Sequence, residues 1–210
     1  MDTYKETFET WDKVAKLYED KFMHIDLFND TYDRFCDLIV KAIHLFSKSV
    51  AGPGNISRYL LHKRPDLILH GIDISPNMIT LAKANNPSAT FSVMDCREIH
   101  QLENRYDGII SGFCLPYLSE ADVSKLMKDV KNLLEEDGVF YISYVPRNKS
   151  DSGFLTGSTG DRTYFYFHTP EFLSGELKAN GFETITLFHK TFRRENGTEE
   201  ANTIILAKKK

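Results

Sequence analysis

Two glycines and one acid have the types and the spacing needed to hold a ligand that contains a nucleoside. Gly52 and Gly54 stand in the stretch Ala51-Gly52-Pro53-Gly54-Asn55, and Asp73 follows about twenty residues later, at the end of the apolar run 67–74. Glycines that open a helix let the backbone approach a ligand closely, and an acid at a strand end can accept hydrogen bonds from both ribose hydroxyls. These residues therefore predict a ligand crevice at one edge of an α/β sheet.

The composition indicates one soluble globular unit. The chain has 210 residues, of which 41% are hydrophobic and 27% are charged, and its formal net charge is −4. This acidic balance gives no basic footprint for nucleic acid, so we expect a small-molecule partner. No apolar run approaches the roughly 20 residues that span a bilayer, and the N-terminus lacks a signal-peptide pattern. We expect a cytoplasmic monomer or homodimer that does not associate with membranes.

Three cysteines, Cys36, Cys96 and Cys114, lack the paired spacing of a metal site. In a reducing compartment they are expected to be free thiols, most simply small buried hydrophobes. We therefore predict neither a disulfide nor a bound metal.

The elements that must position the crevice can be predicted from periodicity and caps. Large apolar side chains recur at helical spacing over residues 4–22 and again over 27–39, which predicts two N-terminal helices. They either cover a sheet edge or form a lid over the crevice, with Tyr18 as a candidate contact. Further helices are expected from 55 to about 64, from 76 to 86, from Ser119 to Asp137-Gly138, and from Pro170 to Asn180-Gly181.

Strands are expected between these helices, over 42–50, 67–74, 89–94, 106–113 and 139–145, and the polar span 146–162 reads as a mobile surface loop. Residues 183–192 and 203–207, joined through Asn196-Gly197, predict a terminal β-hairpin. The fold class is therefore a three-layer, doubly wound, mostly parallel sheet of seven strands that ends in an antiparallel hairpin. Residues 1–41 form a helical cap and residues 42–210 form the main unit.

Four motifs in this order resemble those of the class I S-adenosylmethionine-dependent methyltransferases of the small-molecule type. They are the glycine stretch 51–55, the segment 71–78 around Asp73, Met94-Asp95-Cys96-Arg97, and Tyr106-Asp107-Gly108-Ile109-Ile110. The resemblance covers roughly residues 51–208 and implies methyl transfer from S-adenosyl-L-methionine, with S-adenosyl-L-homocysteine as the product.

By that resemblance, the glycine stretch lies against the methionyl part and the ribose of the cofactor, and Asp73 accepts from the ribose hydroxyls. Ile74 and Met78 would pack on the adenine, Asp95 would accept from its amine, and the backbone of Cys96 would donate to a ring nitrogen. Phe113 would lie near the methionyl group. The implied cofactor site comprises Tyr18, Ala51, Gly52, Gly54, Asp73, Ile74, Met78, Asp95, Cys96 and Phe113. From the residues alone, Asp73 could instead cap a turn, Asp95 could cap a short helix, and Met78 could be core.

The first expected strand departs from the family pattern. The family places an acid four residues before Gly52 and usually a glycine two before it, whereas this chain has Lys48 and Val50. Lys48 would repel both the ammonium and the sulfonium of the cofactor. With free choice of synonymous codons, the codons for residues 41–52 can be read in another frame as G-N-P-S-V-L-E-V-G-C-G, which matches the family pattern without a change in length. We therefore hypothesise a compensated pair of frameshifts that replaced residues 42–51, which peptide mass spectrometry would test.

The catalytic machinery is not specified by the sequence, because methyl transfer mainly needs alignment and exclusion of water. Tyr117, Tyr144 and His168 follow the later strands and are candidates to face the acceptor, although each could equally be structural. One alternative function is that of a cofactor-binding protein without turnover, which Lys48 makes credible. Another is a nicotinamide-dependent oxidoreductase. The dinucleotide-binding fingerprint of such enzymes, G-x-G-x-x-G/A, has glycine or alanine at its third conserved position, whereas this chain has Ser57 there.

Overall fold

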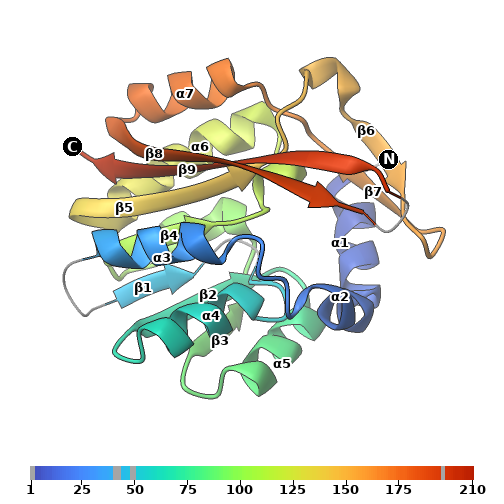
Figure 1. The fold of residues 1–210 in the computed structure, drawn as a ribbon, viewed down its shortest axis with the longest axis horizontal. Coiled ribbons are helices and arrows are strands. Elements are labelled where there is room, and N and C mark those ends of the chain that lie inside the picture. The colour runs from blue at the N-terminus through green and yellow to red at the C-terminus, as the bar shows by residue number, and fades with distance from the viewer. Residues whose placement is uncertain (1–2, 40–43, 48–50, 195–196) are drawn as a thin grey trace.

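A computed structural model describes residues 3–39, 44–47, 51–194 and 197–210, and its arrangement is drawn in Figure 1. The α-helices are α1 (Thr3–Lys13), α2 (Ala15–Phe22), α3 (Asn29–Leu38), α4 (Asn55–Lys63), α5 (Pro76–Asn85), α6 (Glu120–Leu133) and α7 (Pro170–Ala179). Short 3₁₀ turns are η1 (Cys96–Gln101), η2 (Leu115–Tyr117) and η3 (Lys149–Asp151). The strands are β1 (His44–Ser47), β2 (Ile68–Asp73), β3 (Thr90–Val93), β4 (Tyr106–Ser111), β5 (Leu134–Tyr144), β6 (Gly153–Thr156), β7 (Arg162–Phe165), β8 (Phe182–Arg193) and β9 (Glu199–Lys209).

The main sheet has the predicted doubly wound topology. Its seven strands lie in the order β3-β2-β1-β4-β5-β9-β8. The neighbours from β3 to β5 pair in parallel, whereas β9 pairs antiparallel with both β5 and β8. The strand order reverses beside β1, between β2 and β4, which is where open α/β sheets place their ligand crevice. The predicted fold class is confirmed.

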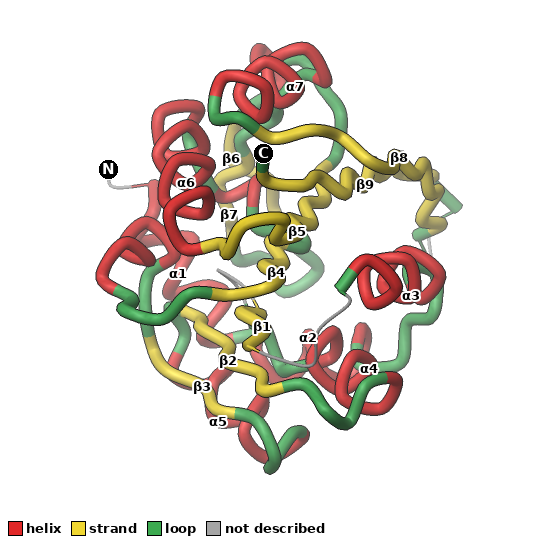
Figure 2. The backbone as a smooth tube through the Cα atoms, turned by 90° about the vertical axis from the view of Figure 1, so that its left-hand side faces the viewer, coloured by secondary structure: helices red, strands yellow, loops and turns green. Residues whose placement is uncertain are grey.

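Helices cover both faces of this sheet, as the edge-on view in Figure 2 shows. One apolar cluster packs α6 and α7 against the sheet, and a second packs α3, α4 and α5 against the other face. The side chains of Phe35, Leu60 and Tyr141 in the second cluster are completely buried. The three layers hold the carboxyl ends of the parallel strands rigidly, which is what a binding crevice needs.

Local caps set several of these boundaries as predicted. The Ser75 hydroxyl accepts from the Met78 N–H at 3.0 Å, and the hydroxyls of Ser119 and Thr169 cap α6 and α7 in the same way. All three described cysteines are buried free thiols, as expected.

Two predicted helix boundaries were wrong. The expected helix over 4–22 is two helices that meet at Val14, because α1 packs on β7 whereas α2 packs on α5. Helix α6 ends at Leu133 rather than at Asp137-Gly138, since Leu134 already pairs with Tyr106 in the sheet. The intervening residues form a bulge in which Asp137 has a φ of 66°.

The span expected to be a mobile loop contains most of a second, two-stranded sheet. Strands β6 and β7 pair antiparallel, with Phe154 opposite Tyr164 and Thr156 opposite Arg162. Figure 1 shows this hairpin beside α1, at the end of the main sheet toward which the β1 and β5 arrows point. The expected strand 42–50 is described only as β1, and the positions of Lys48 and Val50 in the frameshift hypothesis lie outside the described residues.

Candidate functional site

The Asp73 carboxylate lies at the carboxyl end of β2 and is 98% buried. One of its oxygens accepts from the Gly52 N–H at 2.9 Å, and the other accepts from the Ser75 N–H at 2.9 Å. These bonds tie the turn after β1 to the turn after β2. They also hold the carboxylate in one orientation, at the switch point of the sheet.

The two glycines of the motif have different structural roles. Gly52 has a φ of 55°, and an added Cβ would lie 3.8 Å from the Tyr18 ring, in the wall of a cavity. Gly54 has a φ of 87° and opens α4, but it does not line that cavity. A Cβ at Gly54 would collide with the side chain of Asn86 and come within 3.2 Å of the Ala82 backbone. The requirement for Gly54 therefore comes from the packing of α4 against α5.

A first cavity of about 70 Å³ lies beside Asp73. Its wall contains the whole predicted cofactor set except Gly54, and also Tyr117. The structure adds side chains that the sequence prediction missed, most of them from α1 and from the start of α4: Thr7, Phe8, Trp11, Asn55, Ile56, Cys114 and Leu118. Trp11 lies in the segment 4–22, for which the sequence predicted only a helix. It is the one tryptophan of the chain and has other aromatic residues close to it in the sequence, and this was the available signal for a binding role.

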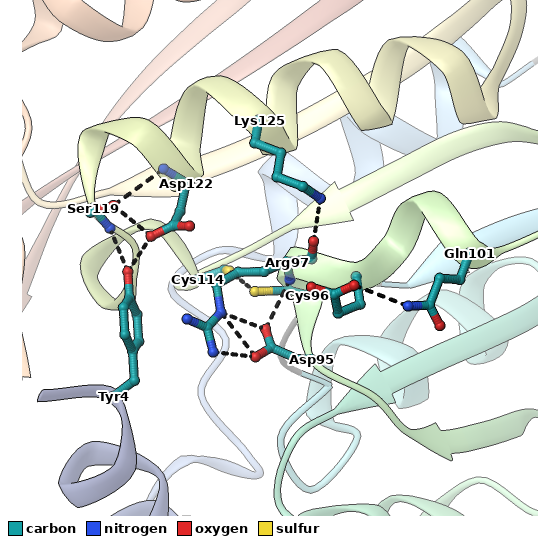
Figure 3. Close-up of polar contacts among 10 residues, drawn as sticks. Tyr4, Asp95, Cys96, Arg97, Gln101, Cys114, Ser119, Asp122 and Lys125 are labelled. Atoms are coloured by element: carbon teal, nitrogen blue, oxygen red, sulfur yellow. Dashed lines mark hydrogen bonds and ion pairs between the residues drawn. The ribbon is translucent and has the colours of Figure 1, made fainter. Parts of the chain in front are cut away.

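Asp95 is already engaged, as the alternative interpretation allowed. Its carboxylate accepts from the Arg97 backbone N–H at 2.9 Å, which caps η1, and from the Arg97 Nε at 2.9 Å (Figure 3). The guanidinium in turn lies 4.1 Å from the centre of the Tyr4 ring. An adenine amine that reaches Asp95 would therefore share it with a bound arginine, and this role stays a prediction.

Two thiols form part of the same wall. The Sγ atoms of Cys96 and Cys114 lie 3.8 Å apart, and both residues are buried (Figure 3). The hydrogen bond with Cys114, together with burial, raises the pKa of the Cys96 thiol well above its usual range. The Cys96 side chain therefore presents neutral, apolar surface to a ligand.

Helix α1 closes the first cavity and is fastened to the elements around it. The Tyr4 hydroxyl donates to Asp122, and the Ser119 N–H donates to that hydroxyl at 3.1 Å (Figure 3). Toward the hairpin, Glu6 pairs with Arg162 at 2.8 Å. These contacts place Phe8 and Trp11 of α1 in the cavity wall. Helix α1 therefore covers the first cavity, and its movement as a lid stays a prediction.

A second cavity of about 320 Å³ shares the wall formed by Trp11, Tyr18, Asn55, Phe113 and Tyr117. Most of its remaining lining comes from the segment between α2 and α3, from the β6–β7 hairpin, and from the end of β8 and the start of β9. This volume lies within the range of small-molecule sites, roughly 300–1,000 Å³. The first cavity lies well below that range.

The structure places the three catalytic candidates in different surroundings. Tyr117 lines both cavities, whereas Tyr144 is 98% buried in the core and lines neither. His168 is also 98% buried, and its Nε2 lies 3.1 Å from the backbone oxygens of both Leu115 and Leu118. The ring fixes η2 from inside and is stacked on Phe172. The predictions that Tyr144 and His168 face the acceptor were therefore wrong. Tyr144 is packed in the core, and the His168 ring is bonded to backbone carbonyls.

Both tyrosines that line the two cavities are neutral near pH 7. Burial, together with the negative charge of Asp73, raises the pKa of Tyr18 to about 12. Burial raises the pKa of Tyr117 well above its usual value. Neither phenol can act as a general base under these conditions.

The chain is similar to known methyltransferases. Residues 50–138 match the family model described as a methyltransferase domain. A protein named putative methyltransferase 235L, from Invertebrate iridescent virus 6, is 31% identical over 91 residues, which are 43% of this chain and 33% of that protein. A malonyl-acyl-carrier-protein O-methyltransferase of Acetivibrio thermocellus is 28% identical over 160 residues, which are 70% of this chain and 51% of that protein. The chain thus spans between a third and about half of these two relatives.

A solved structure shares the whole fold. The magnesium protoporphyrin IX methyltransferase of Synechocystis PCC 6803, crystallised with S-adenosylmethionine, superposes with a TM-score of 0.73 at 16% identity. The match covers 100% of this chain and 98% of that one. At this identity the likeness shows a common architecture.

Proposed function

We propose that this chain is a class I S-adenosylmethionine-dependent methyltransferase that transfers a methyl group from that cofactor to a small molecule. The observation that carries the proposal is the buried Asp73 carboxylate, held between the Gly52 and Ser75 N–H groups beside a cavity. Its position at the switch point suits the ribose hydroxyls of a nucleoside cofactor.

The residues of the first cavity fit that cofactor. An adenine needs apolar faces, and Ile74 and Met78 would supply one of them. Gly52 leaves space where any larger side chain would approach Tyr18. We propose that the ribose lies on Asp73 and that the methionyl part runs toward Phe113, which also lines the second cavity. The methyl group would then point toward an acceptor in that cavity.

The cofactor supplies an activated methyl group, so the protein has to align the acceptor and exclude water. Aromatic side chains around the shared wall, among them Trp11 and Tyr117, would do both. Because neither Tyr18 nor Tyr117 can take a proton at neutral pH, we propose that both position the acceptor.

The small first cavity implies that α1 and α2 move when the cofactor binds. Ligand sites are usually several times larger than about 70 Å³. Since Phe8, Trp11 and Tyr18 all come from these two helices, their displacement would enlarge the cavity directly. We therefore propose that the two helices act as a lid.

The acceptor is proposed to be a small molecule that the protein meets in the cytoplasm. The net charge of −4 argues against a nucleic acid. The Synechocystis enzyme, whose name gives a porphyrin as its substrate, shows that this architecture accommodates small molecules. Among the residues that the structure describes, no helix is long and apolar enough to cross a bilayer.

Calorimetric titration with S-adenosylhomocysteine, and separately with NADH, tests the cofactor assignment against the oxidoreductase alternative. We expect saturable binding of one S-adenosylhomocysteine per chain and no binding of NADH. Binding of NADH alone would contradict the proposal. Binding of S-adenosylhomocysteine without transfer to any acceptor in a broad panel would support the alternative of a protein without turnover.

A further inference from the structure

We infer that the second cavity takes a neutral, aromatic acceptor that carries a hydrogen-bond-accepting atom. This inference rests on the proposed function, which makes that cavity the acceptor site. It concerns the chemical class of the acceptor, which must match the side chains that line the cavity.

The wall is dominated by aromatic rings from several elements. They come from α1, α2 and α3, the segment before α3, the turns after β4, and the strands β7 and β8: Trp11, Tyr18, Phe22, Phe28, Tyr32, Phe113, Tyr117, Phe165 and Phe192. Several already pair with one another, such as Trp11 with Tyr117 at 5.7 Å and Tyr117 with Phe165 at 5.4 Å between ring centres. A flat aromatic ligand placed among them gains both edge and face contacts.

The charged groups of the described wall cancel each other. Arg194 and Glu200 are the only ionic side chains in it, and they form an ion pair at 2.5 Å between Nη2 and Oε2. An anionic acceptor would have to take Arg194 from Glu200, and a cationic acceptor would have to take Glu200 from Arg194. Otherwise the ligand would bury an unpaired charge against aromatic rings, which is costly.

One buried side-chain donor without an acceptor lies in the shared wall. The Trp11 indole N–H is buried and has no hydrogen-bond acceptor among the residues that the structure describes. Trp11 lines both cavities, so a ligand oxygen or ring nitrogen that reached this N–H would supply the missing acceptor. For this reason we infer an aromatic acceptor with an accepting atom rather than a plain hydrocarbon.

Three probes of one ring size test the inference on protein saturated with S-adenosylhomocysteine: 2-naphthol, 2-naphthoate and 2-naphthylmethylammonium. By calorimetry at pH 7 we expect 2-naphthol to bind, and each ion to bind at least about tenfold more weakly because its charge would be unpaired. Tightest binding of the ammonium would overturn the inference in favour of an aromatic cage for cations. Tightest binding of the carboxylate would overturn it in favour of recognition by Arg194.

A matched pair of variants tests whether 2-naphthol binds in the second cavity. Phe165 lines the second cavity but not the first, whereas Phe154, on the partner strand of the same hairpin, lines neither. We expect Phe165→Ala to weaken 2-naphthol binding by about tenfold through loss of ring contacts, while S-adenosylhomocysteine binding stays unchanged. Phe154→Ala should change neither. Equal loss of 2-naphthol binding in both variants would place the probe elsewhere and overturn the inference.

The two levels of the proposal fail separately. If S-adenosylhomocysteine binds normally and none of the three probes binds, the acceptor class is wrong and the proposed function stands. If S-adenosylhomocysteine does not bind to the folded protein, the proposed function itself fails.

Discussion

At the scale of single residues, Asp73 carries most of the proposed cofactor recognition. Asp73→Asn keeps the shape of the side chain but removes the charge that would strengthen hydrogen bonds to the ribose. Because such bonds are worth about 1.5–3 kcal/mol, we expect the affinity for S-adenosylhomocysteine to fall at least about tenfold. Calorimetry measures this directly. Asp66→Asn, which removes an exposed partner of Arg64 far from both cavities, is the control and should bind normally. Equal affinities in the wild type and in Asp73→Asn would contradict the placement of the ribose.

His168 links one buried imidazole to the pH dependence of stability. Its Nε2–H donates to backbone oxygens, and its Nδ1 is buried without a partner among the described residues. Burial lowers the pKa of His168, so the unfolded chain binds more protons below the ordinary imidazole pKa of about 6.5. The free energy of unfolding should therefore fall as the pH drops from 7 to 5.

His168→Gln keeps a side-chain donor and removes the titration. We expect urea unfolding at several pH values to show a shallower loss of stability than in the wild type, by up to about 1.4 kcal/mol per pH unit. His62→Gln alters an exposed histidine of α4 and should leave the slope unchanged. A wild-type slope in His168→Gln would show that this imidazole does not titrate with unfolding.

At the scale of elements, the fastening of α1 should control the rate at which the cofactor binds. Tyr4→Phe removes the hydroxyl that joins Asp122 and the Ser119 N–H but keeps the ring under Arg97. If α1 must open, loss of about 1 kcal/mol of hydrogen bonding should speed association several-fold. The single tryptophan, Trp11, reports binding by stopped-flow fluorescence because it lines both cavities.

Lys5→Ala is the control for this prediction, since Lys5 forms a long, exposed ion pair with Glu9 on the same helix. Its association rate should match that of the wild type. An unchanged rate in Tyr4→Phe would mean that opening of α1 does not limit binding.

The elements also show which sequence signals were sufficient. Ser75-Pro76, Ser119 and Thr169-Pro170 start helices through contacts within one turn, so their boundaries could be predicted locally. The break at Val14 and the β6–β7 pairing depend on partners more than a hundred residues away, such as Thr7 beside Tyr164. No local pattern contains that information.

At the scale of the whole molecule, the site was predictable where the fold itself dictates it. The turn after β1 and the end of β2 must meet in a doubly wound sheet, so Gly52 and Asp73 could be brought together from sequence spacing. The second cavity is lined by separate parts of the chain that pack around the sheet, and its aromatic wall followed only from that packing. Tyr144 and His168 were misassigned for the same reason.

The most direct test is a crystal structure of the protein with S-adenosylhomocysteine. We expect the ribose hydroxyls to lie within hydrogen-bonding distance of the Asp73 carboxylate, the adenine to contact Ile74 and Met78, and α1 and α2 to be displaced from their positions in Figure 1. A complex in which the ligand lies outside this crevice, with Asp73 bonded only to Gly52 and Ser75, would contradict the proposed site.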